Sequence, residues 1–454
     1  MSLLYTSPIV TNSIPYWEFI NDIIQGGEGI KSRGEAYLPK EASENKTSYA
    51  TRLARSTFLD SYNPTVDGIS GLIFKNPIVY GDDIPTQLNP FIENADMQGN
   101  HFDILLEDLF KTALHKGISF ALMDAPNTEA PKSRAEEIKK GIKPYAVIIQ
   151  PENVEAWKTE TINGQIVLTM VKIKETAEID DPSNIYATKV VERRRVLYRG
   201  SWQLWEMGDN GDVLVGEGNT NLDHIPLFAL NLNARGFFSS FPTFYDLGKL
   251  NVDHYQIFSD SRHSAHTASV PFYFGSGINP EDAQGLVISP NTFFSTGDSD
   301  AKLTIVDYDG KGVAVNATLL DRIEQKMSEI GLSVITQDKA LTATEVNISG
   351  AKSQSKLNFY VRALIDTAEL ILLSGAKMYG LNEGGSIDIQ ADILAQPLTA
   401  QEAIALNNMV TSGTMSIENM YSIIESGSFK LGADFDIELE KERIASSGLS
   451  NNLE

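Results

Sequence analysis

The sequence predicts an α+β fold, because helical and strand patterns occupy separate stretches of the chain. Apolar residues recur at helical spacing over most of the segment 1–130 and again after residue 243. Between residues 145 and 218 the spacing falls to two, which is typical of strands with one buried face. At 454 residues the chain is long enough for two or three compact units.

The charge balance and the lack of cysteine exclude several kinds of site. The chain has 37 Lys and Arg against 60 Asp and Glu, a formal charge of −23, so one copy lacks the basic surface of a protein that grips nucleic acid. Without cysteine there are no disulfides, thiolate nucleophiles or zinc–sulfur sites. The start has no basic n-region of a signal peptide and no run approaches a membrane span, so we expect a chain that is soluble where it is made.

The N-terminal part is expected to be mostly helical. Helices are expected over residues 16–25, 47–58, 65–74 and 102–116. A strand is expected over residues 118–124, directly after the last helix. The first and fourth helices should end at Gly26 and Gly117, since glycine favours helix C-termini. Asn63-Pro64 should break the chain between the second and third helices.

A β-meander of about six strands is expected next. The alternating segments are 145–150, 152–161, 165–176, 189–200, 202–207 and 212–218. Asn163-Gly164, between the second and third of these, is a strong signal for a two-residue hairpin turn.

Long helices dominate the second half. A helix over 243–270, about 40 Å long, loses its large apolar residues after Phe258 and ends before Pro271. A small β insert over 272–312 and a helix over 314–333 follow. Thr342 and Glu345 fit a capping box for a helix that continues to Met378, about 50 Å in length. The C-terminal half of the first of these helices is polar and small, so a monomer could not bury it well.

The C-terminal segment 381–454 is strongly acidic, with 12 Asp and Glu against 3 Lys and Arg. Within it Phe435, Ile437 and Leu439 alternate with acidic residues, which predicts a strand with one buried and one acidic face. The same carboxylates could suggest calcium, but the sharp-turn glycine of a calcium loop is missing.

Other candidate sites are equally weak. His263 and His266 with Asp260 could hold a metal, yet the HExxH spacing is absent and such histidines are usually solvated or at a subunit contact. Residues 349–353 resemble only the end of a phosphate-binding loop. The triplet 193–195 is the densest basic run, but in a strand Arg194 points away from its two neighbours, so ion pairs explain it better than nucleic-acid binding. No active site, cofactor or metal is therefore expected, and the chain is predicted not to be an enzyme.

The order of segments resembles one family, the portal proteins of tailed bacteriophages. The segments that carry the resemblance are "EAYLP" (35–39), "YATRLARSTF" (49–58), "TVDGISGLIFKNP" (65–77), "QPENVEAW" (150–157), "LNVDHYQIFSD" (250–260), "TATEV" (342–346) and "FDIELEKERI" (435–444). No single segment is unique to the family. The resemblance rests on the order of the segments, which extends over nearly the whole chain.

The resemblance implies a portal fold with an α-rich and β-meander wing, two stem helices flanking a small β clip, and a long helix that crosses the wing. The implied parts are a wing over 1–240 with its meander at 144–230, a stem helix over 241–271, a clip over 272–312, a second stem helix over 313–335, a tunnel loop over 336–341, a long helix over 342–380 and a C-terminal wing or short crown region over 381–454.

The implied function is structural: a homo-oligomeric ring, usually of twelve copies, at a capsid vertex, through whose channel double-stranded DNA is packaged and ejected without tight binding. Its implied partners are the terminase large subunit, the major capsid or scaffolding protein and a head-tail connector protein, with no membrane. The implied location is the virion's portal vertex, after synthesis in the bacterial host cytoplasm. The channel candidates that follow from this likeness are Thr336, Gln337, Asp338, Lys339, Thr342, Thr344, Glu345 and Lys352.

Two other classes stay open at this point. A carboxylate-dependent hydrolase would act as a monomer or dimer through an acidic pair in the N- or C-terminal region. A ring-forming secreted toxin is disfavoured by the missing signal peptide and the missing amphipathic membrane hairpin.

Overall fold

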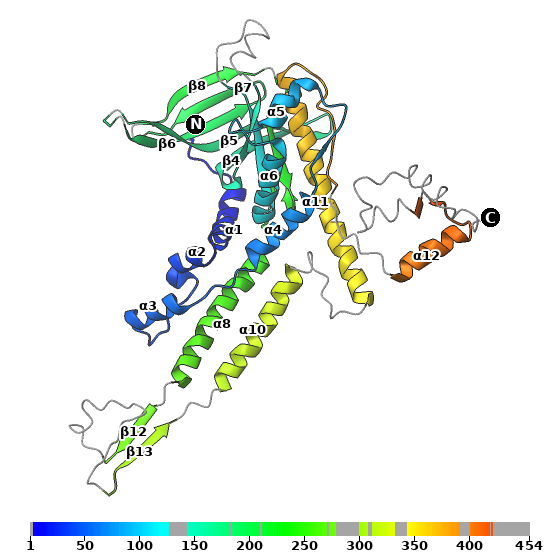
Figure 1. Ribbon diagram of the computed structural model, residues 1–454. Coiled ribbons are helices and arrows are strands. Elements are labelled where there is room, and N and C mark those ends of the chain that lie inside the picture. The colour runs from blue at the N-terminus through cyan, green and yellow to red at the C-terminus, as the bar shows by residue number, and fades with distance from the viewer. Residues whose placement is uncertain are drawn as a thin grey trace.

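The computed structural model describes most of the chain and confirms the α+β prediction. The described residues are 3–126, 143–181, 183–184, 186–208, 211–220, 222–269, 272–277, 299–306, 311–331, 343–390, 400–417 and 419–420. Helices and sheets form a body from which one antiparallel helix pair extends, ending in a β-hairpin (Figure 1). The predicted strand over 434–440 lies outside the described residues.

The N-terminal module is mostly helical, as predicted. Its helices are α1 (Pro8–Ile24), α2 (Gly26–Ser32), α3 (Lys46–Arg55), α4 (Tyr62–Ile73), α5 (Asn89–Glu93) and α6 (Phe102–Lys116), with short 3₁₀ turns η1 (Gly34–Ala36), η2 (Thr86–Leu88) and η3 (Pro151–Asn153). α6 ends at Gly117, whose φ of +84° is left-handed. A side chain there would also meet the Phe241 carbonyl, since a Cβ would lie 2.2 Å from its oxygen.

Two predictions about this module are wrong. α1 begins at Pro8 and not at Tyr16, because proline at the first helical position loses no hydrogen bond. Asn63-Pro64 does not separate two helices, because Pro64 lies in the first turn of α4, where its missing N–H is again harmless. The break comes earlier, over residues 56–61, and Asp60 accepts hydrogen bonds from the first backbone amides of α4.

Two antiparallel sheets replace the expected six-stranded meander. The larger has the order β4 (Val154–Ile162), β5 (Gln165–Asp180), β6 (Thr188–Tyr198), β7 (Ser201–Glu206) and β8 (Val213–Asn219). The smaller has the order β3 (Tyr145–Ile149), β2 (Ile118–Asp124) and β9 (Leu227–Asn231). The assignment of β3 to the meander is thus wrong: η3 turns the chain after it, and β3 pairs with the buried strand β2.

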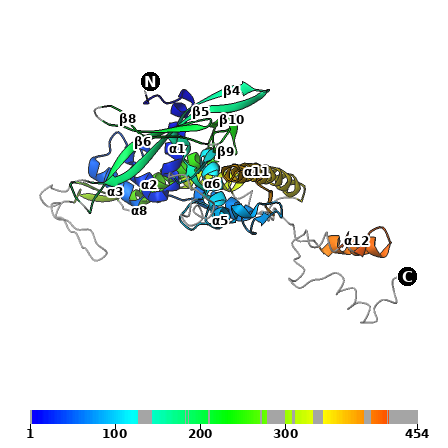
Figure 2. The same ribbon diagram turned by 90° about the horizontal axis from the view of Figure 1, so that it is seen from above.

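The predicted hairpin turn is confirmed. Asn163 and Gly164 both have positive φ, +51° and +78°, as the two central residues of a type I′ turn require. They join β4 to β5, with Ile162 opposite Gln165. Figure 2 shows the five-stranded sheet along one side of the helical body.

The long helices lie close to their predicted bounds. They are α8 (Tyr245–Ser269), α10 (Lys311–Ile330), α11 (Ala343–Met378) and a shorter α12 (Ala400–Thr411). The expected insert between α8 and α10 contains a hairpin of β12 (Phe272–Ser276) and β13 (Lys302–Val306). Two short strand pairs lie elsewhere in the chain. One pairs β1 (Val79–Tyr80) with β14 (Ile387–Asp388), and the other pairs β10 (Ala234–Gly236) with β11 (Ser239–Ser240).

Two buried clusters hold the body together. The larger gathers apolar side chains of α1, α4, α6 and α11, among them Ile20, Ile69, Phe110 and Leu364. The smaller lies between the start of α1 and the two sheets and includes Trp17. Among the residues of α11 whose burial the structure describes, from Ser355 onward, Leu357 is the first that is buried.

Candidate functional site

The arginine triplet on β6 forms ion pairs within the chain. Arg193 pairs with Glu206 at 2.9 Å, and Arg195 pairs with Asp124 and Glu175, both at 2.6 Å. Arg194 is the buried member. The sequence prediction that it points away from the other two, and serves ion pairs rather than nucleic acid, is consistent with this arrangement.

A buried charge cluster ties the chain's start to the meander. Arg194 Nε lies 2.7 Å from Glu155 Oε2, and Lys172 Nζ lies 3.0 Å from the same oxygen. Lys172 also donates to the backbone carbonyls of Leu3 and Tyr5. Glu155 is therefore shared by two buried cations, of which Arg194 also pairs with Glu192 at 2.8 Å and Lys172 holds residues 3–5 against β5.

The α8–α10 pair is joined by a polar contact as well as by apolar packing. His254 on α8 is buried, and its Nε2 lies 2.9 Å from Glu324 Oε1 on α10. The His254 ring stacks on Phe258. Because the helices are antiparallel, this contact fixes which turns of α10 lie level with which turns of α8.

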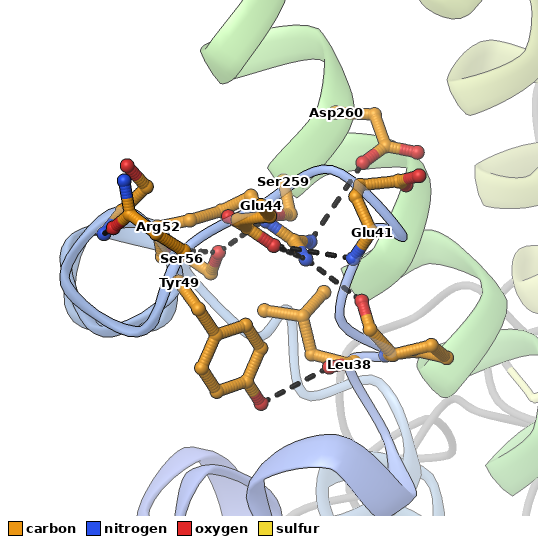
Figure 3. Close-up of polar contacts among 11 residues, drawn as sticks. Leu38, Glu41, Glu44, Tyr49, Arg52, Ser56, Ser259 and Asp260 are labelled. Atoms are coloured by element: carbon orange, nitrogen blue, oxygen red, sulfur yellow. Dashed lines mark hydrogen bonds and ion pairs between the residues drawn. The ribbon is translucent and has the colours of Figure 1, made fainter.

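A polar cluster joins α3 to α8 (Figure 3). Buried Arg52 donates to both carboxylate oxygens of Glu44, at 3.0 and 2.8 Å, and to the Pro39 carbonyl at 2.7 Å. The bond from Arg52 holds the pKa of Glu44 below its ordinary value. Ser56 Oγ lies 2.8 Å from Ser259 Oγ, and both serines are buried. The cluster fixes α3 on one side of α8.

A basic pocket of about 360 Å³ opens beside this cluster. It is lined by Arg52, Arg55, Ser56, Ser259, Arg262, His263 and His266. Arg262 Nη1 donates to the Arg55 carbonyl at the end of α3 and stabilises that helix C-terminus. We call this the α3/α8 pocket, and its lining residues include no carboxylate.

A second, larger pocket of about 610 Å³ lies between the two sheets and the end of α11, and includes Trp202, Tyr145 and Asp124 in its lining. Asp124 is engaged there by Arg195 and accepts a hydrogen bond from the Tyr145 hydroxyl. Within the described part of the chain, no group of three or more His, Asp or Glu side chains could hold a metal ion. None of the helices in that part has the length and apolar character needed to cross a bilayer.

Most of the channel candidates lie outside the described residues. Thr336, Gln337, Asp338, Lys339 and Thr342 are in this group. Thr344, Glu345 and Lys352 lie on the first turns of α11, whose backbone begins at Ala343 as the predicted cap requires. The structure therefore brings none of the eight into a described cluster.

The sequence pattern does not predict the α3/α8 pocket. Arg52 and Arg55 are three apart on one helix, which is a visible local pattern. Arg262 follows far along the chain, and nothing in the spacing indicates that it meets them.

One family model matches a segment in the second half of the chain. Residues 243–377 match the family described as "Domain of unknown function (DUF4055)". The DUF4055 segment runs from α8 through the β12–β13 hairpin and α10 almost to the end of α11. The matched segment is less than half of the chain, so the match describes this segment and not the whole chain. No curated protein matches the chain.

Among solved structures, two similar chains come from gene transfer agent (GTA) particles. One is from the neck of an empty GTA particle computed with C6 symmetry: 9% identity, 80% of this chain and 89% of that chain covered, TM-score 0.44. The other is from the virion of a native GTA particle: 9% identity, 87% and 98% covered, TM-score 0.43. Similarity at this level extends over most of both chains and assigns no role by itself.

Proposed function

We propose that this chain is the subunit of a portal ring at a capsid vertex, a conduit for double-stranded DNA. The observation that carries the proposal is the unit α8–hairpin–α10, followed by long α11. The helix pair extends from the body (Figure 1), and α10 packs on α8 while exposing Val315 and Leu319 at 59% and 39%. A helix pair with such faces suits packing against neighbouring copies in a ring.

The parts of a portal subunit map onto the chain in order. Residues 1–240 are the wing, and the β insert 272–312 is the clip. The stem helices are the segments 241–271 and 313–335, which hold α8 and all but the first two residues of α10. Residues 336–341 are the tunnel loop, 342–380 the long wing-crossing helix, and 381–454 a C-terminal wing or short crown region. The hairpin β12–β13 at the tip of the stem pair supports the clip assignment (Figure 1).

The acidic charge fits a channel that must not retain its cargo. Each phosphate held by Lys or Arg adds affinity through counterion release, which would stall a sliding duplex. About twelve copies at −23 each carry roughly −276 in total, so much of the ring surface repels DNA. The eight candidates of the tunnel loop and the start of α11, including Lys339 and Lys352, would then meet DNA only transiently.

The proposed partners follow from this placement. The clip faces the terminase large subunit during packaging and the head-tail connector protein afterwards, and the wing meets the major capsid or scaffolding protein. The chain itself is structural, with ATP hydrolysis left to the motor, and its place is the virion's portal vertex after synthesis in the host cytoplasm.

Native mass measurement tests the proposal. The expected particle is a closed ring of about twelve copies of the 49.9 kDa chain. A monomer or dimer at every concentration, with a hydrolytic activity that depends on specific carboxylates, would instead support the alternative of a carboxylate-dependent hydrolase.

A further inference from the structure

We infer that the α3/α8 pocket binds a carboxylate from a neighbouring copy of the same chain, and that Asp321 on α10 supplies it. The inference rests on the proposed ring, since it names the contact by which one copy recognises the next. Three observations carry it. The pocket has two arginines without an acidic partner in the described chain, and α10 has a carboxylate without a partner in the described chain. The pocket and this carboxylate also lie at similar positions along the axis of the helix pair.

The pocket's arginines are anomalous for this chain. Acidic residues outnumber basic ones by 60 to 37, so an exposed arginine would ordinarily find a carboxylate nearby. Yet among the described residues neither Arg55 nor Arg262 has an ion-pair partner. Arg55 donates to the Thr51 carbonyl of its own helix, and Arg262 donates to the Arg55 carbonyl and to Thr57. Arg52 differs, because Glu44 already neutralises it.

Two neutral hydroxyls line the pocket beside its arginines. Ser56 and Ser259 are buried and bonded to one another at 2.8 Å. Arg55 and Arg262 thus line the pocket together with neutral polar groups, and such a lining suits a carboxylate better than an apolar side chain.

The complementary surface lies on α10. Ile323 and Met327 pack in the core cluster that α8 shares, and Met327 is buried. The opposite face of the helix follows from the same periodicity. It consists of Ala314, Thr318, Asp321, Gln325 and Glu329, all exposed. The basic residues Arg322 and Lys326 follow one edge of this face, and Asp321 lies at the other edge.

The two carboxylates of this face differ. Glu329 accepts a hydrogen bond from Gln325 at 3.2 Å. Asp321 has no ion-pair or hydrogen-bond partner among the described side chains. It is therefore the carboxylate of this face that is available to a cation from outside its own chain.

The two surfaces lie on different sides of α8. α3 contacts α8 on one side and α10 packs on another (Figure 1). A copy that presents its pocket to the next copy's α10 makes a head-to-tail contact, and such contacts close into rings when the rotation permits.

The heights agree as well. Since His254 meets Glu324 and the helices are antiparallel, Asp321 lies level with about Ile257. This is roughly 3 Å along the axis from Ser259, which lines the pocket. A rotation about a ring axis parallel to the stem keeps heights unchanged, so it carries Asp321 of one copy to the level of the pocket of the next.

Cysteine cross-linking tests the contact directly, because the chain has no cysteine of its own. In the double variant Arg55→Cys/Asp321→Cys, a short bismaleimide cross-linker, which spans the gap that an Arg–Asp ion pair leaves between two Cys side chains, should yield a ladder of covalent oligomers on a denaturing gel. The matched control Lys46→Cys/Asp321→Cys, which moves the first cysteine to the far end of α3, should yield mostly monomer. A ring that shows no ladder with the first pair, or equal ladders with both, overturns the inference.

Charge exchange provides the second arm. Arg55→Glu and Asp321→Arg should each lower the fraction of chain in rings at least tenfold at low salt, and the combination Arg55→Glu/Asp321→Arg should recover most of it. Lys46→Glu, an equal charge change on the same helix, should leave assembly unaltered. Circular dichroism of each variant confirms that the monomer stays folded, and Asp321→Asn provides a milder change on an exposed helix face.

The outcomes separate the inference from the proposed function. If the wild type forms rings and both single charge reversals form them equally well, the contact is wrong and the ring stands. If the wild type forms no ring under any condition, the proposed function itself fails.

Discussion

At the scale of single residues, stability depends on a few buried ion pairs. Glu155 is the clearest case, since Lys172 and Arg194 share one of its oxygens in a buried setting. Removing one partner of such a cluster leaves cations uncompensated, which costs more than the cluster gains when complete. Glu155 and Arg194 lie on different strands far apart in sequence and give no local signal of their pairing, so only the alternation of the triplet can be predicted.

Glu155→Ala should therefore lower the free energy of unfolding by about 3 kcal/mol. Denaturant unfolding followed by circular dichroism measures the change. Glu160→Ala, on the exposed half of the same strand, is the control and should stay within about 0.5 kcal/mol of the wild type. Equal effects of the two changes would show that the buried cluster contributes little.

The Glu44–Arg52 pair predicts a pH dependence. The folded state holds the pKa of Glu44 below its ordinary value, chiefly through the bond from Arg52. A carboxylate with a lowered pKa contributes stability that is complete above its unfolded-state value and is lost as the pH falls through the folded-state value. The contribution should thus fade from about pH 5 downward.

Unfolding measured between pH 7 and pH 3 checks this expectation. Wild-type stability should fall more steeply with acidification than that of Glu44→Gln, which cannot release the pair by protonation. Parallel curves for the two proteins would refute the role assigned to the pair.

At the scale of elements, local sequence patterns predict helix bounds and turns well, but they do not predict which strands pair across long sequence distances. The helix from Ala343 to Met378 and the turn at Asn163-Gly164 have the bounds their residues indicate, because caps and turns depend on neighbours in sequence. The pattern misplaces β3 because strand partners are chosen by contacts far along the chain, here the buried strand β2. Pro64 misleads because proline breaks a helix only beyond its first turn.

The proposed tunnel loop yields a prediction at this scale. Deleting Thr336–Leu341, or replacing Lys339, should spare ring assembly and impair DNA packaging or retention, because the loop would act on DNA and not on neighbouring subunits. Particle mass and packaged DNA per particle are the two measurements. Lys158→Ala, an exposed lysine on β4, is the control and should alter neither.

Failure of the loop deletion to assemble, with a folded monomer, would contradict this division of roles. The segment would then belong to the interface between copies.

At the scale of the whole molecule, two described surfaces are ones that neighbouring copies would cover in the proposed ring. The stem pair exposes apolar side chains and the carboxylate of Asp321 on α10, and the α3/α8 pocket holds two arginines without acidic partners in the described chain. The sequence predicts the order of helix, β insert, helix and long helix, since each has its own pattern. It cannot predict the pocket, which forms only when α3 and the end of α8 meet.

Electron-microscope images of the purified chain test the central claim most directly. The account predicts closed rings of about twelve copies of the 49.9 kDa chain, with a hole along the axis. Uniform compact particles of one or two chains without a hole, at every protein and salt concentration tried, would contradict it.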